Sequence, residues 1–511
     1  MDLKVLRQDV CQNKTVFNRS AEQSIDIDFV LPDYYPSVNK VLKCKTMPRI
    51  TASAINGQTL TSEGTLNILL MYVSSDNQVC SYEHIFNFNK SFELDDDYSD
   101  CIPRCHAQEE YMNCRLINER KVELHGALGI TANVRKKHTE KVICDIDGGN
   151  MVVNRGVTPA TSLIGMAEKY MNIEEDIELG NGQPSIRYLL RYDARAYNID
   201  CKIISGKIVA KGEMSVMVLY CAQEGNTPQT LRTSIPFSQI IDIDAINDDC
   251  ECECYVDVAG LEIKPRTSVT GETRNLTVCA KLRFSANATC NNDVPVIYDA
   301  FSTKYNSDVT FNEITFEKIL KTINDKFISK SNVDLNVSGV NSVIDLWCEP
   351  VINGCVFKDD EIKANGEIKV CMIINDKDDC PIYLEKSFEF EYAHPFKNGD
   401  ENIFCNAKAA VSKTSFTLLN NNCLEVTAEV AVTITAINKI KLSLVTDAKI
   451  DEQAKKESCR DCAMIIYYAN EGEKVWDIAR KYNSSPDEIA EINSIENGSI
   501  CERKPLLIPI K

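Results

Sequence analysis

Apolar and polar residues alternate with a period of two along most of the chain, and this alternation recurs in three copies. Gly64, Gly212 and Gly366 each precede the same run of alternating apolar positions. The positions are Leu66, Ile68 and Leu70 in the first copy, Met214, Val216 and Val218 in the second, and Ile368, Val370 and Met372 in the third. A period of two is typical of a β-strand with one buried face. The pattern therefore predicts a mainly β chain built from three tandem, sandwich-like β-rich repeats.

The spacing of the copies shows where they differ. The three glycines lie 148 and 154 residues apart, whereas Val122, Leu276 and Leu424 of a later strand pattern lie 154 and 148 residues apart. The second copy therefore carries six extra residues between the two patterns, which a surface loop accommodates at small entropic cost. A lead-in that begins at Pro36 and at Pro184 is shared by the first two copies only.

Two segments are predicted to be helical. Residues 311–327, "FNEITFEKILKTINDKF", have the pattern of an amphipathic helix and mark the third copy as divergent. Residues 162–172 are expected to form a short helix between the first two copies. The predicted domains are residues 1–155, 156–302 and 303–449 for the three repeats, 450–462 for a polar linker, and 463–511 for a small C-terminal domain.

The C-terminal residues change period. Residues 464–468 and 506–510 are expected strands, and the segment between them has apolar residues spaced as on one face of an α-helix. These residues are Val475, Ile478, Ala479 and Tyr482. A second helix is predicted after Ser485, because Pro486 at the first helical position and Glu488 complete a capping box. The βααβ order resembles a LysM module, a family that binds N-acetylglucosamine polymers or partner proteins and has no catalytic machinery.

Composition narrows the class of protein. The chain has 511 residues, 44% hydrophobic and 26% charged, which is typical of a folded multi-domain protein. Its formal net charge of -19 argues against nucleic acid or an anionic membrane as the main partner. The N-terminus lacks a secretory pattern and no stretch is apolar enough to span a membrane, so we expect a cytosolic protein. The 23 cysteines are accordingly expected to be reduced thiols.

Two clusters contain enough metal-ligating residues to hold an ion. They are Cys101, Cys105, His106 and Cys114, and Cys250, Cys252 and Cys254. Neither cluster has the two-pair spacing of a structural zinc site. Cys105, Cys254 and Cys405 recur near the repeat period, which predicts one buried cysteine at the start of the same strand in each copy.

Catalytic chemistry has little support. Cys459 and Cys462 form a CxxC pair in the predicted linker, without the βαβ context of a redox site. None of the five histidines lies in a metalloprotease motif or near a nucleophile elbow, and the sequence has no phosphate-binding glycine loop. The sequence therefore predicts no enzyme, no cofactor and no metal. An enzyme is supported only by cysteines that have no assigned role.

The order of the repeats and the C-terminal module carries a second resemblance. The segment "EDIELGNGQPSIRYLL" leads to "GKIVAKGEMSVMVLY", and tandem copies are followed by the LysM-like module. This arrangement resembles the spore-coat morphogenetic proteins of the Clostridia, which carry tandem SPOCS domains and a C-terminal LysM domain. The resemblance implies a mother-cell cytoplasmic protein at the forespore surface. It also implies that the LysM region helps the basement-layer ATPase of the spore coat to encase the forespore.

The module departs from the usual LysM pattern in two loops. The usual Gly-Asp-Thr is Gly472, Glu473 and Lys474, and the lysine cannot accept the orphan amide that a hydroxyl would cap. The usual Pro-Gly-Gln turn is residues 502–504, Glu-Arg-Lys. Because these loops line the sugar groove of glycan-binding members, protein docking is favoured over sugar, and Trp476 is expected to be a core residue.

These observations predict a non-enzymatic scaffold that docks a coat morphogenetic protein through the C-terminal module. The predicted docking edge comprises Gly472, Glu473, Lys474, Val475, Asn493, Arg503 and Lys504. The alternative is a protein that binds peptidoglycan or another N-acetylglucosamine polymer in the cell wall or spore cortex through the same residues.

Overall fold

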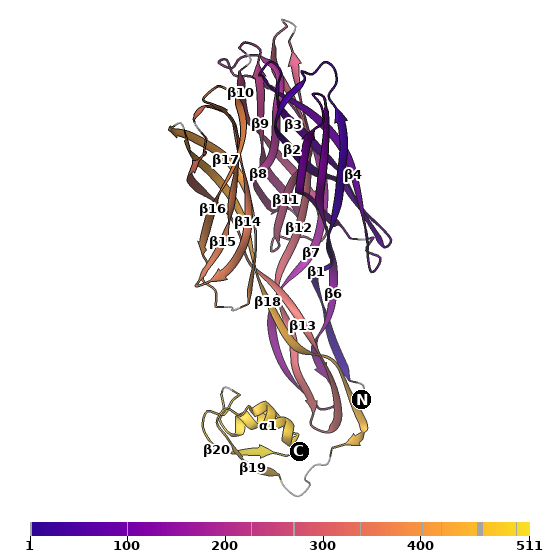
Figure 1. Cartoon of the computed structure of the whole chain (residues 1–511). Helices are drawn as coiled ribbons and strands as arrows, with labels where there is room; N and C mark the ends of the chain where they lie inside the picture. The colour runs from indigo at the N-terminus through magenta and orange to yellow at the C-terminus, as the bar shows by residue number, and fades with distance from the viewer. Residues whose placement is uncertain are drawn as a thin grey trace.

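The computed structural model is mainly β, as predicted (Figure 1). The structure describes residues 3–99, 101–225, 227–268, 271–337, 339–399, 402–420, 422–456, 463–496 and 498–510. Among these residues, the strands before the C-terminal module form six antiparallel sheets of three strands each. They fall into three consecutive sets of six strands, which we call units 1, 2 and 3.

Unit 1 pairs its strands in the orders β1-β6-β5 and β2-β3-β4. Its strands are β1 (Lys4–Val30), β2 (Val38–Asn56), β3 (Thr59–Ser74), β4 (Val79–Glu93), β5 (Pro103–Leu116) and β6 (Lys121–Asp147). The two sheets enclose one hydrophobic core, to which Leu66, Ile68 and Leu70 each contribute a fully buried side chain. The sequence alternation therefore marks the face of β3 that lines this core.

Units 2 and 3 repeat the two strand orders, as β7-β12-β11 with β8-β9-β10 and as β13-β18-β17 with β14-β15-β16. Unit 2 contains β7 (Met151–Glu178), β8 (Ile186–Ile204), β9 (Lys207–Ala222), β10 (Pro228–Asp242), β11 (Glu251–Thr267) and β12 (Thr273–Ser302). Unit 3 contains β13 (Tyr305–Asp334), β14 (Val340–Lys358), β15 (Glu361–Asp376), β16 (Pro381–Pro395), β17 (Ile403–Asn420) and β18 (Cys423–Lys455). The predicted boundaries after residues 155 and 449 fall inside β7 and β18.

The glycine that opens each repeat faces an aromatic ring. Gly64, Gly212 and Gly366 lie directly opposite phenylalanines on the neighbouring strand, namely Phe88, Phe237 and Phe390. A Cβ atom on any of the three glycines would overlap this ring. The recurrence of glycine therefore has a packing cause, because the ring covers the space that a side chain would need.

The lead-in shared by the first two copies is held by a tyrosine. The Tyr72 hydroxyl donates to the Pro36 carbonyl at 2.9 Å, and the Tyr220 hydroxyl donates to the Pro184 carbonyl at 3.1 Å. Unit 3 has Ile374 at the corresponding position of β15. The third copy therefore lacks both the lead-in and the hydroxyl that anchors it.

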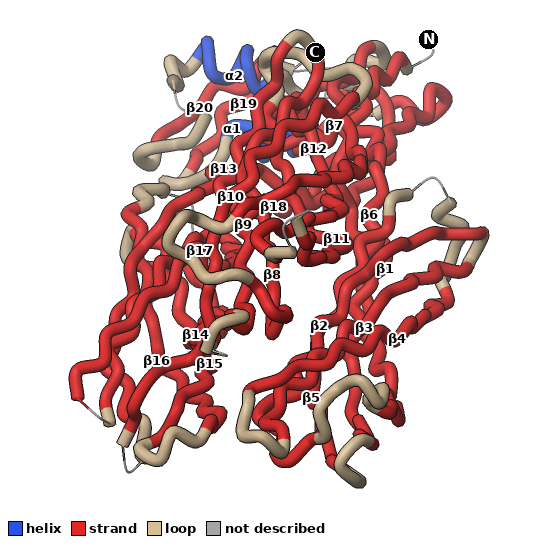
Figure 2. The backbone as a smooth tube through the Cα atoms, turned by 90° about the horizontal axis from the view of Figure 1, so that it is seen from above, coloured by secondary structure: helices blue, strands red, loops and turns tan. Residues whose placement is uncertain are grey.

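The first and last strands of each unit are long and extend beyond the sandwich as a two-stranded ribbon. The three ribbons come together in the narrow part of the molecule, which we call the stalk (Figure 1). Its core is formed by all three units: Val10, Val142, Ala160, Val294, Val296, Ile314, Phe316 and Leu444. From above, β2–β5 of unit 1 and β14–β16 of unit 3 lie as separate lobes (Figure 2).

Both helices predicted within the repeats were wrong. Residues 311–327 lie in β13 and residues 162–172 lie in β7, and both strands form stalk ribbons. Ile314 and Phe316, two residues apart, are buried in the stalk core. The helical period in the sequence was overridden because β13 pairs with β18 along its whole length and buries alternate residues there.

A small module follows the stalk and contains the two helices of the described chain. Its elements are β19 (Met464–Ala469), α1 (Val475–Tyr482), α2 (Pro486–Ile492) and β20 (Lys504–Pro509), and we call residues 463–510 the C-terminal module. Strands β19 and β20 pair antiparallel. Neither helix is long and apolar enough to cross a membrane.

Candidate functional site

The C-terminal module has its own core between the helices and one face of the β19–β20 sheet. Val475, Ile478, Ala479 and Ile489 are buried in it. Ser485 caps α2 through a hydrogen bond from the Glu488 amide, as predicted. At the start of α1, Lys474 occupies the cap position and its side chain caps nothing. The module core therefore packs both helices against the sheet, and α1 begins without a side-chain cap.

The structure brings the two loops of the predicted docking edge together. The Gly472 amide donates to the Ile500 carbonyl at 2.8 Å, and Lys474 forms a β-bridge with Ser499. Gly472 has φ of +84°, which favours glycine there. Lys474 and Arg503 are exposed. These two loops therefore present two exposed cations, next to the exposed carboxylates of Glu471 and Glu502.

Two predicted docking residues have internal roles instead. Val475 is 2% exposed and belongs to the module core. The Asn493 side chain donates to the carbonyls of Ile489 and Leu507, each at 2.8 Å, and accepts from the Leu507 amide at 2.8 Å. Asn493 therefore ties α2 to β20.

Glu473 and Lys504, the other two residues of the predicted docking edge, are neither fully exposed nor part of the module core. Glu473 accepts hydrogen bonds from Tyr467 and Asn470. Although desolvation raises the pKa of Glu473, the bonds from Asn470 and Tyr467 outweigh it and hold this pKa below its usual value. Lys504 begins β20 opposite Ala469 and is half-buried.

Sequence reasoning missed a second surface on the module. On the face of the sheet away from the helices, the cross-strand pairs are Met464 with Pro509, Ile466 with Leu507, and Tyr468 with Pro505. The exposed fractions are 51% for Met464, 62% for Ile466, 67% for Tyr468 and 40% for Leu507. We call these six residues the outer apolar face. The signal in the sequence is that β19 is apolar at every position, whereas a strand with one solvated face alternates.

The module is attached to the end of unit 2 through α1. Trp476 Nε1 donates to Asp299 Oδ2 at 2.8 Å, and Arg480 Nη1 donates to the same oxygen at 2.7 Å. The Phe301 ring meets the Trp476 ring edge-on with centroids 5.1 Å apart, and Phe301 shares the module core. Lys456 Nζ also donates to Asn483 Oδ1 at 2.8 Å. Trp476 is thus half-buried at the boundary between the module and the stalk.

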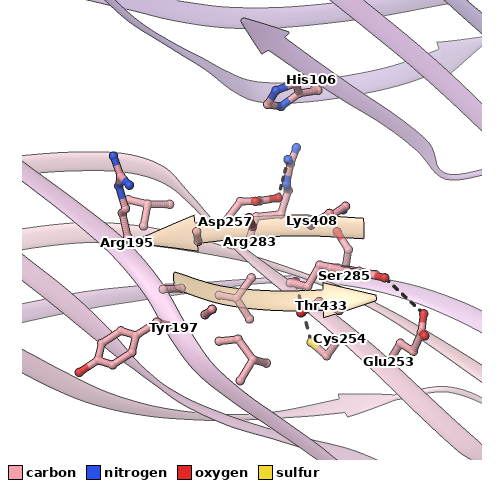
Figure 3. Close-up of a pocket in the computed structure, with 18 of the residues that line it drawn as sticks. His106, Arg195, Tyr197, Glu253, Cys254, Asp257, Arg283, Ser285, Lys408 and Thr433 are labelled. Carbon is pink, nitrogen blue, oxygen red and sulfur yellow. Dashed lines mark hydrogen bonds and ion pairs between the residues drawn. The ribbon is translucent and has the colours of Figure 1, made fainter. Parts of the chain in front are cut away.

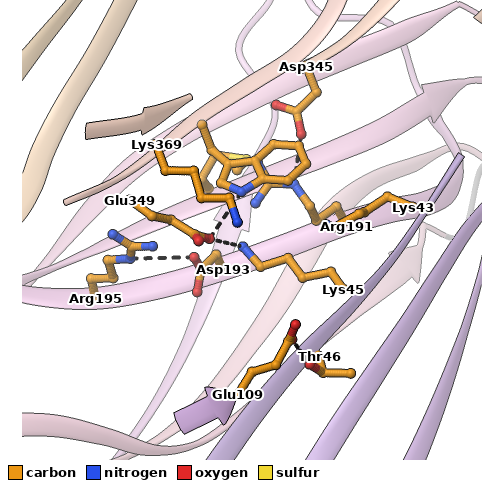
Figure 4. A network of polar contacts seen from close by, with 12 residues as sticks. Lys43, Lys45, Thr46, Glu109, Arg191, Asp193, Arg195, Asp345, Glu349 and Lys369 are labelled. Carbon is orange, nitrogen blue, oxygen red and sulfur yellow. Dashed lines mark hydrogen bonds and ion pairs between the residues drawn. The ribbon is translucent and has the colours of Figure 1, made fainter. Parts of the chain in front are cut away.

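The three units meet along β2, β8 and β14, where a polar network lies beside an apolar junction (Figure 4). The register places Lys43, Arg191 and Asp345 at equivalent positions, opposite Met71, Leu219 and Ile373 respectively. Arg191 Nε donates to Asp345 Oδ2 at 2.7 Å, and both side chains are 1% exposed. The equivalent positions of units 2 and 3 thus carry opposite charges, and this buried pair joins β8 to β14.

A further cavity lies among the units, lined by β5, β11 and β17 (Figure 3). Cys105 and His106 of the first group of metal-ligating residue types line it, as do Cys250, Cys252 and Cys254 of the second. Among the described residues, no three His, Cys, Asp or Glu side chains are grouped closely enough to hold a metal ion. Cys459 and Cys462 lie outside the described residues.

One family model matches the chain in two regions. The model is described as SipL, SPOCS domain, and it matches residues 37–117 and 185–265. These regions correspond to β2–β5 of unit 1 and β8–β11 of unit 2, so they omit the long strands that form the stalk. No curated protein and no solved structure matches the chain. The two matched regions indicate a sporulation-related coat protein.

Proposed function

We propose that this chain is a non-enzymatic scaffold in spore coat assembly. Its C-terminal module docks a coat morphogenetic protein, the basement-layer ATPase, at the forespore surface in the mother-cell cytoplasm. The two matches to the SPOCS domain support the coat assignment, and the LysM-like sequence of the module supports a binding role. The three units supply a rigid body that holds the module at one end, since the stalk core includes residues of all three.

The outer apolar face is the observation that carries the docking proposal. Six neighbouring apolar residues on a two-stranded sheet leave apolar surface in contact with water, and such patches mark interaction sites. The exposed cations Lys474 and Arg503 lie on the loops of the same module. The partner surface is therefore apolar, with carboxylates placed opposite Lys474 and Arg503.

The proposal is tested by capture of the purified ATPase on immobilised full-length chain. Ile466→Arg should remove the apolar contact, and Lys474→Glu with Arg503→Glu should reverse the charge at those two positions. Each should weaken capture at least tenfold and leave the thermal unfolding temperature unchanged, because these side chains are exposed. Glu491→Lys, an exposed change on α2, is the matched control. Full capture by both variants would refute the docking surface.

Peptidoglycan binding is the second candidate function. The loops that line the sugar groove in glycan-binding LysM modules lie side by side here, joined by the Gly472–Ile500 hydrogen bond. This function predicts that the chain pellets with purified sacculi, and that Lys474→Glu with Arg503→Glu alters pelleting whereas Ile466→Arg does not.

A further inference from the structure

The cavity among the three units has a volume of about 1890 Å³, and equivalent strands of all three units line it (Figure 3). The register places His106, Tyr255 and Lys408 at equivalent positions on β5, β11 and β17. Their cross-strand neighbours are the hydroxyl residues Thr131, Ser285 and Thr433. All six line the cavity. At this equivalent position, each unit therefore places a different polar side chain in the cavity wall.

Cations gather around Tyr255 in this cavity. Lys408 Nζ lies 4.2 Å from the centre of the Tyr255 ring and the Arg104 guanidinium 5.2 Å from it. Burial lowers the pKa of Lys408, and the charge of Arg104 lowers it further. Burial and the charge of Arg135 likewise lower the pKa of Arg104. The cations therefore repel one another in a partly desolvated space.

The carboxylates nearby are committed to other partners. Asp257 pairs with Arg283 at 3.1 Å, and Glu253 accepts from Thr322 at 2.7 Å. Within the described chain, no ion pair of 4.0 Å or less joins Arg104, Arg135 or Lys408 to a carboxylate. Arg135 Nε is also buried without a hydrogen-bond partner. The charges of Asp257 and Glu253 raise the pKa values of Arg104 and Lys408 and so offset part of this repulsion, but neither carboxylate pairs directly with either cation.

We propose that this cavity binds a multivalent oxyanion, a phosphate or a polycarboxylate, between Arg104 of unit 1 and Lys408 of unit 3. A guanidinium offers two parallel donors that match a carboxylate or phosphate, and an ammonium adds a point charge. The hydroxyls of Thr131 and Thr433 line the same cavity, but they are hydrogen-bonded to Ser20 and Asn324 respectively, so the two cations carry the proposed site. Because the two cations come from different units, the bound anion would also join units 1 and 3.

The test is calorimetric titration of the full chain with inorganic phosphate and, separately, with citrate, at constant ionic strength in chloride. We expect one of the two anions to bind and to raise the unfolding temperature. Arg104→Gln and Lys408→Gln should each weaken binding at least tenfold. Lys413→Gln, an exposed change on the same β17 that does not line the cavity, should bind as the parent does.

A second readout separates binding from folding. Without added anion, Lys408→Gln should unfold at the same temperature as the parent or higher, because it removes an unpaired cation. Binding of phosphate but not citrate would assign a phosphate ligand, and the reverse a polycarboxylate. No binding of either anion at millimolar concentration, or equal binding by the two cavity variants and the parent, would overturn the proposal.

An independent observation concerns the thiols. In each unit, one pair of cysteines joins the second strand to the fifth, across the two sheets. The pairs are Cys44 with Cys114, Cys201 with Cys252, and Cys355 with Cys405, and the two strands that carry each pair contact each other. Both members of each pair pack against the same hydrophobic core. Cys201 Sγ also lies 3.2 Å from the Cys252 carbonyl oxygen.

The register shows which pairs are equivalent. Cys252 and Cys405 lie opposite Ala288 and Ala436, which correspond in the two units, so the pairs of units 2 and 3 match. The expectation that Cys105, Cys254 and Cys405 share one position is thus wrong by two residues for Cys405. Unit 1 has Pro103 at the equivalent position and forms its pair elsewhere. The recurring feature is therefore the link between the two strands.

The geometry points to three intramolecular disulfides that form on oxidation, one clamping each sandwich. With a glutathione disulfide as oxidant, the thiolate of one cysteine attacks it, a mixed disulfide forms and one glutathione thiol leaves. The second cysteine thiolate then attacks the mixed disulfide and releases the other glutathione thiol. The two cysteines lose two electrons and two protons, and the oxidant is reduced to two thiols.

The test is non-reducing peptide mapping of the full chain after incubation with oxidised glutathione and alkylation. We expect three cross-linked peptide pairs with the stated partners, and a rise in unfolding temperature that dithiothreitol reverses. Cys252→Ser should abolish only the pair of unit 2 and leave Cys201 alkylated or glutathionylated. The exposed Cys380 is the control and should give no internal link. Links scattered among other cysteines, or free Cys201 and Cys252, would overturn the inference.

Discussion

Arg480 of α1 donates to Asp299 of β12 at 2.7 Å. Asp145 of unit 1 and Asp447 of unit 3 occupy the positions equivalent to Asp299, and each meets an arginine from a neighbouring ribbon. Asp145 binds Arg155 at 2.6 Å, and Asp447 approaches Arg7 at 3.7 Å. The register puts Phe311 of β13 at the position of these two arginines, opposite Val445. The C-terminal module therefore supplies the cation that unit 3 lacks, which explains why it sits on unit 2.

Replacement of Asp299 should loosen the module without unfolding the units. Asp299→Asn removes the charge that Trp476 and Arg480 share, and the pair is partly exposed, so we expect a loss of about 1 kcal/mol or less. Tryptophan fluorescence should shift to longer wavelength, and proteolysis between the stalk and the module should accelerate. Asp145→Asn breaks the equivalent pair in unit 1 and should change neither. An unchanged spectrum for Asp299→Asn would contradict this attachment.

The Arg191–Asp345 pair should be essential to the junction of units 2 and 3. Asp345→Ala leaves the Arg191 charge buried, since both side chains are 1% exposed, and should cost about 3–5 kcal/mol in the free energy of unfolding. The double variant Arg191→Met with Asp345→Leu should recover most of this loss. Glu262→Gln, which breaks an exposed pair with Lys264, should cost less than about 1 kcal/mol. Denaturant unfolding measures all three, and a small loss for Asp345→Ala would show that the junction tolerates the unpaired charge.

The repeated glycines should differ in their tolerance of alanine. At Gly366 a new Cβ would meet the Val351 carbonyl oxygen as well as the Phe390 ring, and backbone cannot easily move. At Gly212 it would lie 2.7 Å from Phe237 and 2.8 Å from Ile199, both at the ends of side chains. We expect costs within about 1–3 kcal/mol, with Gly366→Ala the larger. Equal losses in urea unfolding would show that the ring alone sets the cost.

Acid should weaken the unit junction through Glu349. Burial raises the pKa of Glu349, but the charges of Lys45, Arg195 and Lys369 outweigh burial and hold this pKa below its ordinary value. A carboxylate with a depressed folded-state pKa stabilises the fold above its unfolded pKa, about 4.3, and this contribution is lost as pH falls through the folded pKa.

The unfolding temperature of the parent should therefore fall more steeply between pH 5 and pH 3 than that of Glu349→Gln. Glu313→Gln, which is exposed beside Lys441, serves as the control and should keep the slope of the parent. Parallel curves for the parent and Glu349→Gln would contradict a role for this carboxylate.

Much of the fold could be predicted because its signals are local. The alternation after Gly64 marks β3, and the capping box at Ser485 marks the start of α2. The ribbon strands were missed at residues 311–327 because short apolar spacings fit both a helix and a strand. Only pairing with β18, more than a hundred residues away, decides between them.

Only those parts of the candidate site that have a local signal in the sequence could be predicted. The loops at Gly472 and Arg503 are conspicuous in sequence because they depart from a known pattern. The structural role of Asn493 depends on β20, and the attachment of Trp476 depends on Asp299 in another unit. Neither relationship has a local signal. The outer apolar face did have one, in the uninterrupted apolar run of β19.

The most direct measurement is co-purification from sporulating cell lysate with the full-length chain and with the chain ending at Lys456, and sacculi pelleting of the same two samples. The proposed function predicts that the coat ATPase is captured by the full-length chain and lost on truncation, and that neither sample pellets with sacculi. Pelleting of the full-length chain with sacculi, without a captured coat protein, would contradict it and establish a glycan-binding module.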